Sequence, residues 1–215
     1  MTTYVRTAFF ALAIVASSNA LASAAVITFT SEAAFDAATN ATVVEDFESF
    51  SPKDTNLAVI VSNGITYTPV GTGTNVAVAS PGYTNFGAGV NPTTTSILTA
   101  SGNEDFTGVF SSPAFAVGFD VFLNGLGPAT ATFFNDATLL GTVAFPTGDD
   151  QRFAGILSDV AVTSFRWTAT RGGELNTGID NVALGDAAQV PEPATVLLLG
   201  FGLLAAARRW RQPSW

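Results

Sequence analysis

The chain has 215 residues, and its composition excludes several classes of enzyme and binding site. It contains neither cysteine nor histidine, which rules out disulfide bonds, thiol nucleophiles, histidine-based triads and Cys/His zinc sites. The net charge of −9, with only 8 basic residues, argues against nucleic acid as a partner, because phosphate binding requires clustered Lys and Arg.

Residues 1–24 have the three parts of a secretory signal peptide. Arg6 supplies the positive charge, residues 8–16 form a short apolar run, and small residues follow. Cleavage by signal peptidase is predicted after Ala24, with Ala22 as the second choice. An uncleaved membrane anchor is the alternative interpretation.

Residues 25–186 are predicted to form an all-β domain with one short helix. Thr30 or Ser31 can cap a helix that begins at Glu32 and has Phe35 and Ala38 on its inner face. Short runs rich in β-branched and aromatic residues follow, separated by turn residues. The predicted strands are Thr42–Phe47, Gly64–Tyr67, Asn75–Ala79, Ser96–Thr99, Phe106–Phe110, Ala114–Leu123, Ala129–Phe134, Thr138–Phe145, Arg152–Leu157, Val160–Ala169 and Ile179–Leu184.

Strict alternation within one of these runs predicts which face is buried. Phe115, Val117, Phe119 and Val121 fall on one side of the strand, as expected for the core side of a sheet. Many such strands without a fixed-period repeat favour a two-sheet β-sandwich of jelly-roll type.

The end of the sequence combines a proline motif, an apolar segment and a basic cluster. Residues 187–193 are a linker that contains Val190, Pro191, Glu192 and Pro193, and the prolines keep it extended. Residues 194–207 are predicted to form a hydrophobic transmembrane helix that is short for a bilayer. Residues 208–215 form a basic tail expected to stay cytoplasmic, in which Arg208, Arg209 and Arg211 stop transfer.

These three parts together resemble the PEP-CTERM sorting signal of Gram-negative bacteria. The resemblance implies a substrate of exosortase that is exported across the inner membrane, passes through that membrane transiently, and becomes a cell-surface or extracellular protein. It also implies an association with exopolysaccharide or biofilm. Such tails are also known under the name of an ice-binding protein C-terminal domain, although the tail itself has no ice-binding chemistry. A plain membrane anchor is the alternative.

The middle of the chain is similar to the jelly-roll, lectin-like domains found before such tails. The similarity rests on four fragments, and it implies a fold without assigning a function. The fragments are Glu45–Glu48, Val117–Val121, Phe153–Ile156 and Gly178–Val182.

Five polar residues near the two ends of the domain are candidate calcium ligands. First and last strands often meet at one edge of a sandwich, and calcium prefers carboxylate and amide oxygens. The candidates are Glu45, Asp46, Glu48, Asp180 and Asn181. The alternative is that these are solvated side chains on edge strands.

Three aromatic residues are candidates for ligand contact. Trp167 offers a flat ring for stacking on a sugar, although its apolar neighbours also favour a place in the core. Tyr67 and Tyr83 lie near predicted loops, where each could touch a ligand or cover the core.

We expect a non-enzymatic exported protein that associates with exopolysaccharide, with weak carbohydrate binding as the finer hypothesis. No motif selects a catalytic residue, and the Ser-hydrolase and nucleotide-binding signatures are absent from the sequence. A polysaccharide-active hydrolase using paired carboxylates is the first alternative. A purely structural matrix component is the second.

Overall fold

The computed structural model describes residues 25–71, 73–83, 94–123, 127–148, 150–169 and 177–188. The predicted signal peptide, the Pro-Glu-Pro motif, the hydrophobic segment and the basic tail lie outside these ranges. Among the residues that are described, no helix is long and apolar enough to cross a membrane.

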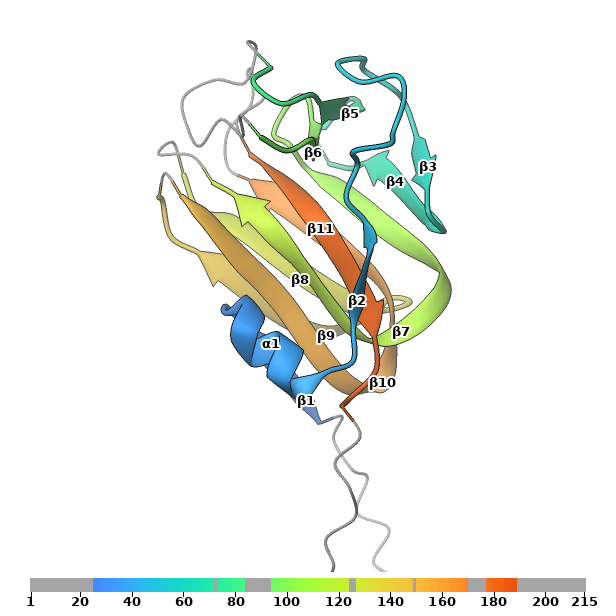
Figure 1. The fold of residues 1–215 in the computed structure, drawn as a ribbon, viewed down its shortest axis with the longest axis vertical. Helices are drawn as coiled ribbons and strands as arrows, with labels where there is room; N and C mark the ends of the chain where they lie inside the picture. The colour runs from blue at the N-terminus through green and yellow to red at the C-terminus, as the bar shows by residue number, and fades with distance from the viewer. Residues whose placement is uncertain are drawn as a thin grey trace, which may run out of the picture.

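One short helix and a set of antiparallel strands make up the described part of the chain (Figure 1). The elements are β1 (Val26–Phe29), α1 (Glu32–Ala38), β2 (Thr42–Glu45), β3 (Ile60–Ser62), β4 (Ile65–Pro69), β5 (Val76–Ala79), β6 (Ile97–Ala100), β7 (Phe106–Phe122), β8 (Ala129–Asn135), β9 (Thr138–Phe145), β10 (Gln151–Ala169) and β11 (Gly178–Gly185). This confirms the predicted β-rich fold with one short helix.

Two long strands connect the layers of the sandwich. β7 has 17 residues and β10 has 19, and they pair with each other in two stretches separated by register shifts. The first half of β7 and the second half of β10 lie in a layer with β3, β4, β8 and β9. The other halves pair with β11 and β1, and β2, β6 and β5 continue from β11. Strands that are distant in sequence are therefore neighbours, as in jelly-roll sandwiches.

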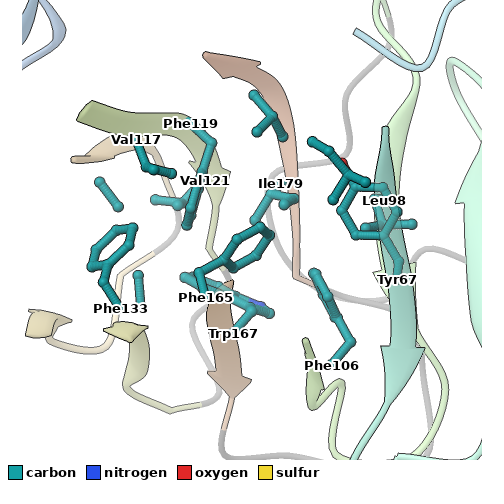
Figure 2. Packing of buried hydrophobic residues seen from close by; sticks show 14 of the residues in the cluster. Tyr67, Leu98, Phe106, Val117, Phe119, Val121, Phe133, Phe165, Trp167 and Ile179 are labelled. Carbon is teal, nitrogen blue, oxygen red and sulfur yellow. The ribbon is translucent and has the colours of Figure 1, made fainter. Parts of the chain in front are cut away.

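Large aromatic side chains fill the space between the two layers (Figure 2). Phe119 and Phe165 meet with ring centroids 4.7 Å apart, and Phe106, Phe133 and Trp167 are fully buried around them. The chain has no cysteine and so no disulfide bond can stabilise the fold. Burial of one large apolar side chain contributes about 1.5–3 kcal/mol, so this core is a major source of stability.

The helix α1 covers the outer face of the β7–β10 layer. Ser31 caps it by accepting a hydrogen bond from the backbone N–H of Ala34, as predicted. Phe35 is the buried residue of the helix, and its ring lies 5.2 Å from that of Phe153. Gly118 of β7 permits this approach, because a Cβ atom there would lie 2.5 Å from the Phe153 ring and 2.9 Å from the Phe35 ring.

The strand predictions failed where the chain passes between layers. Residues 106–122 and 151–169 each form one continuous strand, whereas the sequence predicted two strands in each range. Phe115 is 40% exposed although Val117, Phe119 and Val121 are buried as predicted. The register shift beside it interrupts the alternation, which explains the exception. The short strands β1 and β3 were not predicted.

The end of β11 is fastened to the segment after α1. Thr39 and Ala187 form an isolated β-bridge, and the backbone N–H of Ala188 donates to the carbonyl of Ala38. The last described residues therefore leave the domain beside the helix.

Candidate functional site

A bulge in β11 brings polar side chains together on the outer face of the sheet. The pairing of β11 with β7 shifts register between Asp180 and Ala183, and Asn181 has a positive φ of 51°, which asparagine tolerates better than most residues. Asp180 pairs with Asp120 across the strands. The side-chain amide of Asn181 donates a 2.8 Å hydrogen bond to Oδ2 of Asp120.

Thr95 lies between two carboxylates that come from distant segments. Its Oγ1 is 2.5 Å from Oδ2 of Asp180 and 3.0 Å from Oε1 of Glu48. A threonine hydroxyl has one proton, so it can donate to only one of them. Both contacts are hydrogen bonds when Asp180 is protonated, donates to Thr95, and leaves the threonine proton for Glu48.

The pKa values of the two carboxyls favour this arrangement below about pH 6, whereas above it Asp180 is ionised and accepts from Thr95. Burial raises the pKa of Asp180 to about 6, and the charges of Asp120 and Glu48 act in the same direction. Hydrogen bonds from Thr95 and from the backbone N–H of Asn181 oppose that rise. The backbone N–H of Ser96 lowers the pKa of Glu48, to which it donates a 2.6 Å hydrogen bond.

A cavity of about 250 Å³ lies beside this cluster, between α1, β2 and the outer face of the sheet. Carboxyl and amide groups share its wall with two aromatic rings. The lining residues are Glu32, Phe35, Asp36, Ala41, Val43, Asp120, Phe153, Asn181 and Ala183. Sites for drug-sized ligands typically measure about 300–1,000 Å³, so this cavity suits a smaller ligand.

Two carboxyl groups of the cavity, those of Glu32 and Asp120, have raised pKa values. Partial burial raises the pKa of Glu32, and the charges of Asp120 and Asp36 add to this effect. Burial likewise raises the pKa of Asp120, although hydrogen bonds from Asn181 and Gln151 oppose it. The cavity therefore repels anions and offers acceptors for neutral or cationic donors.

The structure separates the five predicted calcium ligands instead of gathering them at one point. Glu45 is buried and uses both carboxylate oxygens, accepting from the backbone N–H of Phe47 at 2.7 Å and from the amide of Asn63 at 3.1 Å. Asp46 accepts from the backbone N–H of Glu48 in a local turn. The side-chain amide of Asn181 is directed at Asp120, and the carboxyl groups of Glu48 and Asp180 are bridged by the hydroxyl of Thr95.

Across the described ranges, no three or more acidic, histidine or cysteine side chains gather closely enough to hold a metal ion. The five predicted residues thus do not gather in one cluster, because their side chains face different neighbours. Calcium binding by this chain stays a prediction.

Two of the three predicted aromatic contacts lie in the core. Tyr67 and Trp167 are fully buried, so neither presents a ring to a ligand, and Figure 2 shows both within the packed cluster. The indole N–H of Trp167 donates to Oγ1 of Thr177 at 3.2 Å. Tyr83 is half-buried and packs against the cluster that includes Phe122, where ligand contact stays a prediction.

Of the residues that line the cavity, sequence reasoning singled out Asn181 as a candidate ligand, but it missed Glu32 and Asp120. Asp120 carried a usable signal, because it occupies the outward phase of a strongly alternating strand beside Gly118 and Ala116. Thr95 had no such signal, since its importance comes from the meeting of three segments distant in sequence. The sorting motif at 190–193 and the arginines at 208, 209 and 211 lie outside the described residues.

Comparison with known proteins supports the interpretation of the C-terminal residues. Residues 189–212 match the family model described as a PEP-CTERM protein-sorting motif. No curated protein matches the chain. The motif indicates an exported protein that is sorted and processed by an exosortase, which agrees with export to a Gram-negative envelope.

Proposed function

We propose that the described domain is a non-enzymatic carbohydrate-binding module that associates this exported protein with exopolysaccharide at the cell surface or in a biofilm matrix. The observation that carries the proposal is the cavity beneath α1, where carboxyl and amide groups converge beside the rings of Phe35 and Phe153. Concave sites with an apolar wall and a few convergent polar groups are typical of small-molecule binding.

The chemistry of the cavity selects the kind of sugar. Asp120 and Glu32 can accept hydrogen bonds from sugar hydroxyls, and Asn181 presents an amide at the same wall. The raised pKa values of both acids show that further negative charge is unfavourable there. A neutral sugar unit therefore fits better than a uronic acid or a sulfated sugar.

Titration calorimetry with neutral and acidic oligosaccharides tests this proposal. The full-length chain in mild detergent is expected to bind a neutral member of the panel. Asp120→Asn and Glu32→Ala should each weaken that binding about tenfold or more, since a hydrogen bond to a charged group contributes about 1.5–3 kcal/mol. Asp136→Asn is the matched control, because Asp136 lies in the turn between β8 and β9 and does not line the cavity.

Circular dichroism must show that each variant keeps its fold. Binding that is unchanged in both cavity variants would contradict the proposal. The absence of any oligosaccharide binding would contradict it too, and would favour the purely structural matrix component.

The paired acids of the cavity also favour a second candidate, a polysaccharide-active hydrolase. Glycoside hydrolysis uses two carboxyl groups, one of which needs a raised pKa to act as the acid. Glu32 and Asp120 both have raised pKa values and line one cavity. Release of reducing ends from a polysaccharide, lost in Asp120→Asn, would support the hydrolase over the binding module.

A further inference from the structure

The sheet face opposite the aromatic core presents rows of hydroxyl groups. One row crosses five strands through successive paired positions of β4, β7, β10, β8 and β9. Its members are Thr68, Thr107, Arg166, Thr132 and Thr142. We call this surface, together with the row beside it, the threonine face.

The neighbouring row of the threonine face is more aliphatic. Val61, Thr66, Val109 and Ser164 occupy successive paired positions of β3, β4, β7 and β10. Val61, on the edge strand β3, is 67% exposed, and Val109, on β7, is 48% exposed. The threonine face thus combines regularly placed hydroxyls with exposed methyl groups.

Sheet geometry fixes the positions of these groups. Neighbouring strands lie about 4.8 Å apart, and residues two apart on one strand are separated by about 6.7 Å. The hydroxyls of Thr68 and Thr107 are already hydrogen-bonded to each other at 3.0 Å, and β-branched side chains have few rotamers. The array therefore loses little conformational entropy when it meets a flat partner.

The two rows carry almost no net charge, although the whole chain has a net charge of −9. Arg166 is the charged member, and its guanidinium contacts Oδ2 of Asp105 at 3.1 Å, which neutralises it locally. The acids of the cavity lie on the other layer, around Asp120 of the second half of β7. The threonine face is thus a surface that a neutral partner can approach without desolvating an unpaired charge.

We propose that the threonine face adsorbs to the flat surface of an insoluble, neutral polysaccharide. Such a surface presents hydroxyls together with C–H groups, and so complements alternating hydroxyls and methyls without any need for charge. The inference rests on the proposed function in taking a carbohydrate as partner, but it concerns a second site. The cavity takes one soluble sugar unit, whereas the threonine face takes an extended surface.

Adsorption isotherms on particles of cellulose, chitin and an insoluble β-glucan test the inference, using the full-length chain in mild detergent. Val109→Lys/Thr132→Lys places two charges in the middle of the face, and should reduce adsorption at least tenfold. Ile27→Lys/Thr42→Lys is the matched control, since it adds the same charge at exposed positions of β1 and β2. Wild-type adsorption should not depend on salt.

Unchanged adsorption of the Val109→Lys/Thr132→Lys protein would overturn the inference, provided circular dichroism shows a native fold. Leu139 of β9 pairs with Phe134, which pairs with Ser164, so it continues the second row of the threonine face. Because its side chain is 59% exposed, Leu139→Lys provides a second and milder variant. A wild-type dimer that these variants dissociate would overturn it too, because the face would then be an interface between copies. Loss of soluble-sugar binding in Glu32→Ala with retained adsorption separates the cavity from the threonine face.

Discussion

Asp180 and Thr95 are joined by a 2.5 Å contact between Oδ2 and Oγ1, and the same hydroxyl oxygen lies 3.0 Å from Glu48. This shared hydroxyl connects the last strand, the segment before β6 and the loop after β2. When Asp180 is protonated both contacts can be hydrogen bonds, whereas its ionisation leaves two carboxylates competing for one threonine proton.

Stability should therefore fall as the pH rises through the pKa of Asp180. The folded-state pKa of about 6 exceeds the reference value of 3.8, so the stabilisation by this group is complete below about pH 4 and is lost as pH rises through about 6. Asp180→Asn mimics the protonated acid and should remove this loss, gaining up to about 3 kcal/mol over wild type at pH 8.

Urea unfolding of both proteins between pH 4 and pH 8 measures this difference. Glu48 contributes with the opposite sign, because its lowered pKa gives stability that is lost as the pH falls. The difference between Asp180→Asn and wild type isolates the Asp180 effect. Parallel stability curves for the two proteins would contradict the shared-proton interpretation.

Gly118→Ala should displace α1 from the sheet. The new Cβ would lie 2.5 Å from the ring of Phe153 and 2.9 Å from that of Phe35, and overpacking of this kind costs about 1–3 kcal/mol. Gly141→Ala is the comparison, because its Cβ would approach side-chain methyl groups at 3.1 Å or more, which requires a smaller shift. Thermal unfolding of the two variants gives the result, and equal losses would argue against tight packing beneath the helix.

The fluorescence of Trp167 should be insensitive to quenchers in the solvent and to added sugars. In a Trp210→Phe/Trp215→Phe background Trp167 is the remaining tryptophan of the chain. Because its side chain is fully buried and its N–H is bonded to Thr177, its fluorescence should be blue-shifted and poorly quenched by acrylamide. Strong quenching, or a spectral change on adding oligosaccharide, would restore the stacking hypothesis.

Calcium removal gives a direct test of the calcium hypothesis. The remaining pair, Glu48 and Asp180, supplies far fewer oxygens than the six to eight that calcium prefers. Any stabilisation should therefore be small and should need millimolar calcium at a pH above 6, where Asp180 is ionised. A melting temperature that EDTA lowers in wild type but not in Asp180→Asn would support calcium at this pair.

Local sequence patterns predicted the elements well where one side of each element is buried. The helix from Glu32, its cap at Ser31 and the boundaries of Thr138–Phe145 follow from spacing and alternation, and the structure has them. The continuity of β7 and β10 could not be predicted, because register shifts depend on the partner strand.

The candidate site was much less predictable than the fold. Tyr67 and Trp167 are of residue types that are common in ligand-binding sites. Their place in the core depends on packing between strands that are distant in sequence. Asp180 was identified from its position near the end of the domain, although its partner Thr95 was not. The separation of Glu45 from the other candidate ligands could not be predicted either, because it depends on the hydrogen bond from Asn63, which is distant in sequence.

The attachment of the last described residues beside α1 has a mechanical consequence. A pull on the chain beyond residue 188 first meets the bridge between Thr39 and Ala187, and then acts along β11, which has hydrogen-bonded neighbours on both sides. Tension along the axis of such a strand loads many of its hydrogen bonds in shear at once, instead of opening them one by one. If the domain is pulled by its C-terminal end, the strand that bears the force, β11, is thus held by hydrogen bonds on both sides.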